Sequence, residues 1–297
     1  MRRKLVLSLI TLASVCLMFA SSLAAFPYLW RNLHPQPKPT RQQLFQGITY
    51  EVQVRQLPRP MVVHVVTVDL RQPGIRFLVT PGDPREELPL QARTTAKFLE
   101  EFNLQLAVNG DGFQPWRSNS ILDYYPHPGD PVAPIGLAAS QGVIYSVPTD
   151  AEPALYISRT NQARFQTPTG KIYNAISGNL MLVEQGQVVA ENGDTPQPRT
   201  AVALDKAGKR LILIVVDGRQ PRYSQGATLA ELAEIIIENG GHFGMNLDGG
   251  GSSTLVKQGK NGRAELLNSP IEHGIPGRQR PVGNHLGIYA SPIAPEN

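Results

Sequence analysis

The sequence contains a single cysteine, Cys16, which lies inside an apolar N-terminal run. The rest of the chain therefore has no residue that could form a disulfide or give a thiolate ligand to zinc. Its six histidines also lack the spacing of a metal site. An exported protein without disulfides is more typical of a bacterium than of an animal secretory pathway.

Charge is also scarce, because only 18% of the residues are Asp, Glu, Lys or Arg. The net charge of +4 is scattered along the chain, which argues against a nucleic-acid partner. Proline and glycine are frequent, with 26 and 27 residues, and they predict many turns and short strands. A chain of 297 residues with 41% hydrophobic residues can form one large domain or two small ones.

The N-terminus carries a targeting signal. Arg2, Arg3 and Lys4 precede an apolar run over residues 5–25. This run is either a signal peptide cleaved near Ala24 or a signal anchor that contacts the membrane through residues 5–30. Either interpretation places the rest of the chain outside the cytoplasm, in the periplasm, the cell envelope or the medium. The expected divisions are the signal at 1–30, a Pro-rich linker at 31–46, a domain at 47–291 and a tail at 292–297.

The domain shows alternating strands and helices. Strand patterns cover residues 48–54, 61–70, 77–80 and 104–109, a helix is expected over 94–102, and a hairpin over 179–190. Two strands at 200–205 and 210–218 precede a helix that begins after Thr228 and a strand at 243–248. The order strand, helix, strand implies parallel strands. The sequence therefore predicts an α+β fold with a mixed β-sheet core, a βαβ unit at 210–248 and flanking helices.

Two strands of that unit end in Asp-Gly, at Asp217 and Asp248. Ligands of α/β sheets gather at the carboxyl edge, where the ends of parallel strands meet. If the strands are neighbours about 4.8 Å apart, both carboxylates share one pocket, where they serve acid/base chemistry or hold a metal. The alternative is that each Asp only caps a turn.

A glycine run follows Asp248 directly. Gly249, Gly250 and Gly251 precede Ser252 and Ser253. Backbone N–H groups of such a loop can converge on an anion, although a plain turn is the alternative. No lysine precedes the serines, so the loop is not a nucleotide P-loop. A serine esterase using Ser252 is disfavoured because the glycine of a nucleophile elbow is missing.

Arginines lie next to these strand ends and loops. Arg199 precedes a strand, Arg219 follows Asp217 closely, and Arg280 precedes the last strand. Guanidinium groups bind phosphate oxygens bidentately. These positions therefore favour a site for a phosphorylated ligand.

The segment "AVNGDGFQPW" is a further candidate for ligand binding. Asn109 and Asp111 follow a strand and could bind sugar hydroxyls, while Phe113 and Trp116 could stack on a pyranose ring. The alternative is a β-turn with buried aromatic residues.

The segments "PRTAVALD", "VDGR", "NLDGGGSSTLV" and "RPVGNHLGIY" resemble the phosphodiester glycosidase family. The resemblance covers roughly residues 105–291 and is strongest from Pro198 to Val256. It implies hydrolysis of the bond between the anomeric carbon of a sugar and a phosphodiester. Asp111 stands where the family has glycine, which indicates a different sugar.

The resemblance also implies a set of site residues. Catalysis is assigned to Asp248 and Asp217. Substrate binding is assigned to Asn109, Asp111, Ser177, Gly178, Arg199, Arg219, Ser224, Asn246, Gly249, Gly250, Gly251, Ser252, Ser253 and Arg280.

The expected function is that of an extracytoplasmic hydrolase acting on a phosphorylated glycan or a sugar-nucleotide-like substrate. The main alternative is a non-catalytic protein that binds anionic polysaccharide or assembles exopolysaccharide on the same fold. A purely structural envelope domain is a further alternative. No cofactor is required by this expectation, and a divalent cation such as calcium between the two aspartates stays open.

Overall fold

The computed structural model describes residues 14, 18, 26, 29–31, 33–147, 152–168 and 170–293. The signal peptide or anchor expected over residues 1–30 lies almost entirely outside these described residues, as does most of the tail at 292–297. Within the described part of the chain, no helix combines the length and the hydropathy that a bilayer crossing requires.

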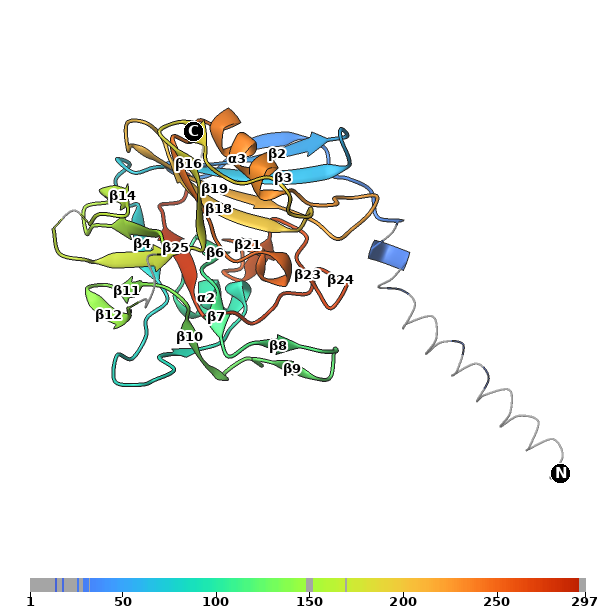
Figure 1. The fold of residues 1–297 in the computed structure, drawn as a ribbon, viewed down its shortest axis with the longest axis horizontal. Helices are drawn as coiled ribbons and strands as arrows, with labels where there is room; N and C mark the ends of the chain where they lie inside the picture. Colours follow the sequence, from blue (N-terminus) through green and yellow to red (C-terminus); the bar gives the residue numbers. More distant parts are fainter. Residues whose placement is uncertain are drawn as a thin grey trace, which may run out of the picture.

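The largest sheet has eight strands and lies in the upper part of Figure 1, beside α3. Its strands, in spatial order, are β1 (Thr40–Phe45), β2 (Ile48–Arg55), β3 (Met61–Asp69), β19 (Arg210–Val216), β18 (Arg199–Leu204), β20 (Phe243–Asn246), β16 (Leu180–Glu184) and β17 (Gln187–Val188). Apolar residues run continuously through β3, β18 and β19 because both faces of these strands are covered.

A second sheet packs on one face of the first. It contains β22 (Ala264–Leu266), β21 (Leu255–Gln258), β6 (Leu106–Asn109), β25 (His285–Tyr289) and β4 (Arg76–Val79). Side chains such as Val66 and Leu213 of the first sheet meet Val108 and Ile288 of the second in one buried core. Two antiparallel sheets therefore form a sandwich.

A helix covers each outer face of this sandwich. Helix α3 (Leu229–Glu238) packs Leu232 and Ile236 against Ile212 of the large sheet. Helix α2 (Thr95–Glu101) packs Phe98 against Leu78 of the smaller sheet. The layers are therefore helix, sheet, sheet, helix.

The predicted helices and the predicted hairpin are present with boundaries close to those expected. Thr94 caps α2, and Thr228 with Glu231 forms a capping box at the start of α3. Strands β16 and β17 form the hairpin that turns at Gln185 and Gly186.

The predicted mixed sheet is wrong in its strand pairing, because all neighbouring strands in the described sheets are antiparallel. Strands β19 and β20 do run in the same direction and are joined by α3, but β18 lies between them and pairs with both. Their axes are therefore about 9.6 Å apart, twice one strand spacing. The fold remains rich in β-sheet with few helices.

A third sheet extends one side of the sandwich with β12 (Val143–Ser146), β11 (Ala138–Ser140), β15 (Asn174–Ser177), β13 (Ala154–Ile157) and β14 (Ala163–Phe165). A short three-stranded sheet and two short strand pairs complete the fold. They are β5 (Leu90–Gln91), β10 (Pro131–Pro134) and β7 (Phe113–Gln114); β8 (Arg117–Ser118) and β9 (Tyr124–Tyr125); β23 (Ile271–Glu272) and β24 (Ile275–Pro276).

The segment expected as a linker differs from that expectation at its end. Strand β1 pairs with β2 and belongs to the large sheet. Before it, the ring of His34 packs against that of Tyr223 in a tilted arrangement, with 4.1 Å between ring centroids. Gln36 donates a hydrogen bond to the carbonyl oxygen of Tyr223 at 2.8 Å. The chain therefore contacts the domain before residue 47.

Candidate active site

Asp217, at the end of β19, is only 1% exposed. Its carboxylate accepts hydrogen bonds from the Tyr223 hydroxyl at 2.9 Å and from the Asn268 side-chain amide at 2.9 Å. The backbone N–H of Ser269 donates to both oxygens, and His64 Nε2 lies 2.8 Å from Oδ2. A carboxylate with this many partners is a structural anchor for the loops at 217–224 and 267–269.

His64 extends this buried network to a second tyrosine. Its Nδ1 lies 2.7 Å from the hydroxyl of Tyr50, which donates to the carbonyl oxygen of Leu267 at 3.0 Å. Burial and the nearby charge of Asp217 raise the pKa values of Tyr50 and Tyr223, so both hydroxyls stay protonated. This network cannot be predicted from the sequence, because nothing in the order of residues links positions so far apart in the chain.

Ser224 belongs to the same structural network. Its hydroxyl donates to the carbonyl oxygen of Asp217 at 2.5 Å and accepts from the backbone N–H of Val62 at 3.0 Å. The residue is fully buried. Ser224 therefore holds the loop that follows β19 against β3.

Arg219 projects from that loop toward the glycine run. The residue has a φ of 59°, which a non-glycine residue adopts only when the surroundings hold it there. Its Nε donates to Gln197 at 2.8 Å. Burial and the charges of Arg280 and Arg199 lower the pKa of Arg219, so these three guanidinium groups act on one another.

The glycine run leaves room for two of these arginines. A Cβ on Gly250, whose φ is +62°, would lie 2.9 Å from Nη2 of Arg219. A Cβ on Gly251 would lie 1.8 Å from Oε2 of Glu272 and 2.5 Å from Nη2 of Arg280. Glycine is needed at positions 250 and 251 because charged side chains pack so closely against this backbone that a Cβ would collide with them.

Asp248 lies at the start of this run and is partly exposed. Its backbone N–H donates to Gly110 at 3.0 Å, and its carbonyl oxygen accepts from Asn109 Nδ2 at 2.7 Å. Burial raises the pKa of its carboxyl to about 6, and the charge of Asp111 raises it as well, while a hydrogen bond to Ser252 and the charge of Arg280 oppose the rise.

Arg280 faces Asp248 across the site. Its Nε and Nη2 donate to one oxygen of Glu272 at 3.0 and 2.7 Å, and its Nη1 donates to the Ser252 hydroxyl at 3.2 Å. The guanidinium carbon lies 5.1 Å from the ring centroid of Trp116. Glu272, which sequence reasoning missed, therefore fixes the orientation of Arg280.

A cavity of about 200 Å³ brings Asp248 and Arg280 together. Gly112, Phe113, Trp116 and Ile135 complete its lining. The cavity thus has a carboxylate and a guanidinium among its walls, with aromatic residues beside them. The expectation that Asp217 shares one pocket with Asp248 is wrong, because Asp217 is buried and does not line this cavity.

Most of the other predicted residues do not line the cavity but bond to segments next to it. Asn109 is fully buried, and its Oδ1 accepts from the hydroxyl of Thr200 at 2.9 Å. The hydroxyl of Ser253 accepts from Thr200 at 3.1 Å. Arg199 donates to the carbonyl oxygen of Ala227 at 3.0 Å and forms an ion pair with Asp194, next to Gly249.

Ser177 ends β15 of the third sheet and Gly178 follows it, whereas Asn246 ends β20 of the eight-stranded sheet. The Ser177 hydroxyl donates to Asp111 at 2.5 Å. A Cβ on Gly178 would lie 2.2 Å from the carbonyl oxygen of Asn246, so only glycine permits this approach. The side-chain amide of Asn246 donates to Asn179 at 2.8 Å.

The described residues contain no group of three or more His, Cys, Asp or Glu side chains that could hold a metal ion. The oxygens of Asp217 already accept hydrogen bonds from protein donors. This donor set does not fit a divalent cation held between Asp217 and Asp248.

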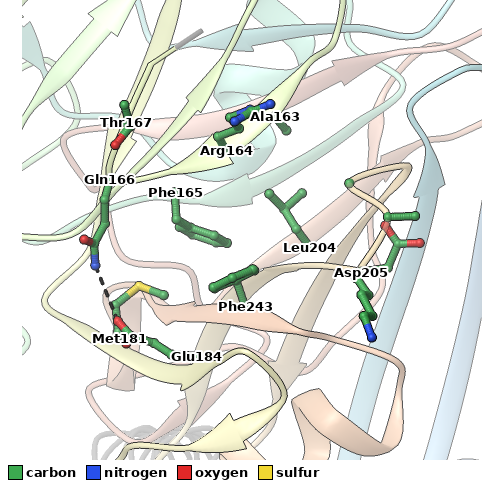
Figure 2. A pocket seen from close by; sticks show the side chains of 13 residues that line it. Ala163, Arg164, Phe165, Gln166, Thr167, Met181, Glu184, Leu204, Asp205 and Phe243 are labelled. Carbon is green, nitrogen blue, oxygen red and sulfur yellow. Dashed lines mark hydrogen bonds between the residues drawn. The ribbon is translucent and has the colours of Figure 1, made fainter.

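A larger cavity of about 510 Å³ lies elsewhere, and none of the predicted site residues lines it. Figure 2 shows Phe165, Leu204, Phe243 and Met181 gathered in it, with charged side chains such as Asp205 at its margin. Charged side chains of both signs line it as well, but the aspartates that end the Asp-Gly strands, the glycine run and Arg280 are all absent from its lining. The smaller cavity is therefore the better candidate for chemistry.

A family model described as phosphodiester glycosidase matches residues 77–289 of the chain. This stretch includes Asp111, Asp217, Asp248 and Arg280. A comparison with curated proteins finds no match.

Three solved structures are similar in fold. A hypothetical protein from Synechocystis has a TM-score of 0.63 and 17% identity, with 86% of this chain and 64% of that chain covered. The zebrafish N-acetylglucosamine-1-phosphodiester α-N-acetylglucosaminidase catalytic domain, auto-inhibited by its pro-peptide, has a TM-score of 0.58 and 21% identity, with 86% of each chain covered. A Burkholderia pseudomallei protein described as exported has a TM-score of 0.54 and 14% identity, with 77% of this chain and 74% of that chain covered. The present chain thus spans less than two thirds of the Synechocystis protein.

Proposed function

Because this chain belongs to the phosphodiester glycosidase family, we propose that it hydrolyses the glycosidic bond of a sugar-1-phosphodiester. The products are the free sugar and a phosphomonoester. The observation that carries this proposal is the cavity in which Asp248 and Arg280 face the same space beside Trp116. During bond cleavage the sugar end of the substrate becomes positive and the phosphate end becomes more negative. A carboxylate and a guanidinium in one small cavity can stabilise these two charges.

Asp248 is the residue we assign to the anomeric carbon. Glycosidases stabilise an oxocarbenium-like transition state with carboxylates. Ionised Asp248 either takes a proton from the attacking water or attacks the anomeric carbon itself. The bond between that carbon and the phosphate oxygen breaks, and its electron pair leaves with the phosphate.

The arginines and the glycine run are assigned to the phosphate. A phosphomonoester leaves more easily than a sugar alkoxide, so stabilisation of its negative charge matters more than its protonation. Arg280 lines the cavity, and Arg219 packs on Gly250 beside it. Such fixed cationic donors stabilise charge that develops in the transition state.

Asp217 has a different role in this proposal from the catalytic role expected from the sequence. It holds the loop from which Arg219 projects. Through Asn268, which donates both to Asp217 and to the carbonyl oxygen of Ser253 at 3.1 Å, it also supports the end of the glycine run. Asp217 is therefore a positioning residue.

The test uses the full chain and a synthetic N-acetylglucosamine-1-phosphodiester as substrate. We expect measurable release of sugar, and a loss of about 10²-fold or more in kcat for Asp248→Asn. Asp205→Asn, in the turn between β18 and β19, is the control and should keep wild-type activity. Full activity in Asp248→Asn would overturn the assignment.

Binding of anionic polysaccharide without turnover is the second candidate. It is favoured by one observation, namely that Asp248 is the sole carboxylate among the residues that line the 200 Å³ cavity. Tight binding of a phosphorylated glycan without any release of sugar would support this candidate over hydrolysis.

An extracytoplasmic location is part of the proposal. The basic and apolar N-terminal run supports it, as does the similarity in fold to a protein described as exported. Labelling of intact cells with a reagent that does not cross the cytoplasmic membrane tests it.

A further inference from the structure

The wall of the proposed active-site cavity is partly apolar and reaches the surface. Trp116 and Ile135 both line the cavity, yet they are 52% and 51% exposed. They therefore form part of its rim, whereas Phe113, the third large apolar residue of the lining, is buried. Large apolar side chains that stay half exposed beside a cavity are typical of surfaces that a ligand covers.

A short hairpin continues this apolar rim. It consists of β8 and β9, begins at the residue after Trp116, and lies near the bottom of Figure 1. Its turn carries Ile121 and Leu122, which are 45% and 90% exposed. Leu122 is the most exposed large apolar residue in the described part of the chain. Two adjacent apolar residues therefore occupy a turn in which polar residues are usual.

The polar groups of the hairpin bond to one another. Asp123 accepts hydrogen bonds from Arg117 Nε at 3.1 Å and from the Asn119 side-chain amide at 2.9 Å. The Ser120 hydroxyl accepts from the backbone N–H of Asp123 at 3.0 Å. Because its two charges form an ion pair, the hairpin offers a ligand apolar contact in preference to charge.

Contacts with residues 271–280 hold the hairpin on the arginine side of the cavity. The Ser118 hydroxyl lies 3.0 Å from Nε2 of His273. The ring of Tyr124 meets that of His273 edge-on, with 5.1 Å between centroids, and its centroid lies 5.7 Å from the guanidinium carbon of Arg278. The same segment supplies the arginine that lines the cavity. The hairpin therefore lies beside the end of the site that we assign to the phosphate.

The volume of the cavity limits how much of the substrate it can enclose. Its 200 Å³ is less than the roughly 300–1,000 Å³ of pockets that enclose a whole drug-sized ligand. With the sugar at Asp248 and the phosphate at Arg280, the alcohol on the far side of the phosphate lies outside. The guanidinium carbon of Arg280 is 5.1 Å from the ring centroid of Trp116. The second ester of a phosphate held there therefore lies beside Trp116.

We propose, resting on the phosphodiester glycosidase function above, that this second alcohol is a long-chain aliphatic alcohol. Its chain lies along the apolar rim, which consists of Trp116, Ile135, Ile121 and Leu122. Three of these four side chains are aliphatic and form no hydrogen bond, so the hydroxyls of a second sugar would find no side-chain partner on them. Covering the rim with an aliphatic chain removes apolar surface of both partners from water.

The test compares four N-acetylglucosamine-1-phosphodiesters that differ only in this alcohol, each below the concentration at which it aggregates. The alcohols are methanol, octanol, diethylene glycol monoethyl ether, which has as many chain atoms as octanol, and a hexose joined through its primary hydroxyl. Each methylene group that is fully buried contributes about fourfold. We expect kcat/KM of the octyl diester to exceed that of the methyl diester and of the ether analogue at least tenfold. Equal values for the octyl diester and the ether analogue, or a preference for the hexose, would overturn the proposal.

Variants of the rim test whether its residues cause the preference. Ile135→Ser and Leu122→Ser should each lower the octyl-to-methyl ratio of kcat/KM by threefold or more. The ratio cancels losses that affect both substrates equally. Val188→Ser, which changes an exposed residue of edge strand β17 outside the cavity lining, is the matched control and should leave the ratio unchanged. A wild-type ratio in both rim variants contradicts the proposal.

A bilayer is the other apolar surface that could cover this rim. The diesters are monomeric in the assay, so a preference for octanol without vesicles assigns the rim to the substrate. A preference that appears only after phosphatidylcholine vesicles are added would assign the hairpin to a membrane surface and overturn the proposal.

Binding of a product separates this proposal from the proposed function. Octyl phosphate and the phosphate of the ether alcohol are titrated into the full chain by calorimetry, and we expect octyl phosphate to bind at least tenfold more tightly. If the wild type releases no sugar from any diester, the proposed function fails, while this difference still decides whether an apolar rim adjoins a phosphate site. If sugar is released but the two phosphates bind equally, only the aliphatic alcohol is wrong.

Discussion

The two Asp-Gly pairs look alike in the sequence but have different roles in the structure. Asp217 is surrounded by donors from His64, Tyr223 and Asn268, and Asp248 opens onto the cavity. The sequence identified both acids, the glycine run and Arg280. It could not distinguish the anchor from the exposed acid, because the donors around Asp217 come from distant parts of the chain.

The raised pKa of Asp248 predicts a measurable effect on stability. Its folded-state pKa of about 6 exceeds the 3.8 of an unperturbed aspartate, so the folded protein binds this proton more tightly than the unfolded chain does. Stability therefore falls as the pH rises from about 4 to about 6, and the penalty is complete above pH 6. The full shift corresponds to about 3 kcal/mol, which solvent screening at a partly exposed residue reduces to about 1–2 kcal/mol.

Asp248→Asn should consequently be more stable than the wild type by about 1–2 kcal/mol at pH 7.5 and about equally stable at pH 3.5. Urea unfolding at both pH values measures this difference. Equal or lower stability of the variant at pH 7.5 would show that the carboxylate is not under strain from burial. The gain in stability would accompany the loss of activity expected above, as is common for residues held in costly environments for function.

At the scale of elements, helices α2 and α3 and most strands of the two packed sheets could be predicted, but the pairing of these strands and the short strands between residues 113 and 177 could not. The segment 200–218 is a hairpin, and β18 of that hairpin lies between β19 and β20. A pattern of strand, helix, strand predicts that its two strands are parallel, but it does not predict whether another strand lies between them. The contacts between β3, β19 and the 267–269 loop could not be predicted either, because they depend on the buried network around His64.

That network predicts how β3 and β19 depend on each other. His64→Phe keeps a flat ring beside Tyr50 but removes both nitrogens, which leaves Asp217 and the Tyr50 hydroxyl each without one buried partner. We expect a loss of about 2–3 kcal/mol in the free energy of unfolding. Lys206→Ala, in the exposed turn between β18 and β19, should change it by less than about 0.5 kcal/mol. Chemical denaturation of both variants is the measurement, and equal stability would exclude a structural role for the network.

At the scale of the whole molecule, the four layers place the site at one end of the sandwich. The loops after β6, β19 and β20 come from both sheets, and they supply Asp111, Arg219 and Asp248. The site therefore requires both sheets to be packed together. The sequence placed these residues at strand ends, but only the sandwich shows that loops from two separate sheets meet there.

The chain before β1 also takes part in this assembly. His34 is 8% exposed and its ring contacts that of Tyr223, whose hydroxyl donates to Asp217. His34→Ala should lower the free energy of unfolding by about 1 kcal/mol, since it removes an aromatic contact that covers Tyr223. Lys38→Ala, an exposed position in the same segment, serves as the matched control. If both variants unfold at the same urea concentration as the wild type, residues 34–39 are only a spacer. If His34→Ala alone unfolds at a lower urea concentration, this segment stabilises the loop that carries Arg219.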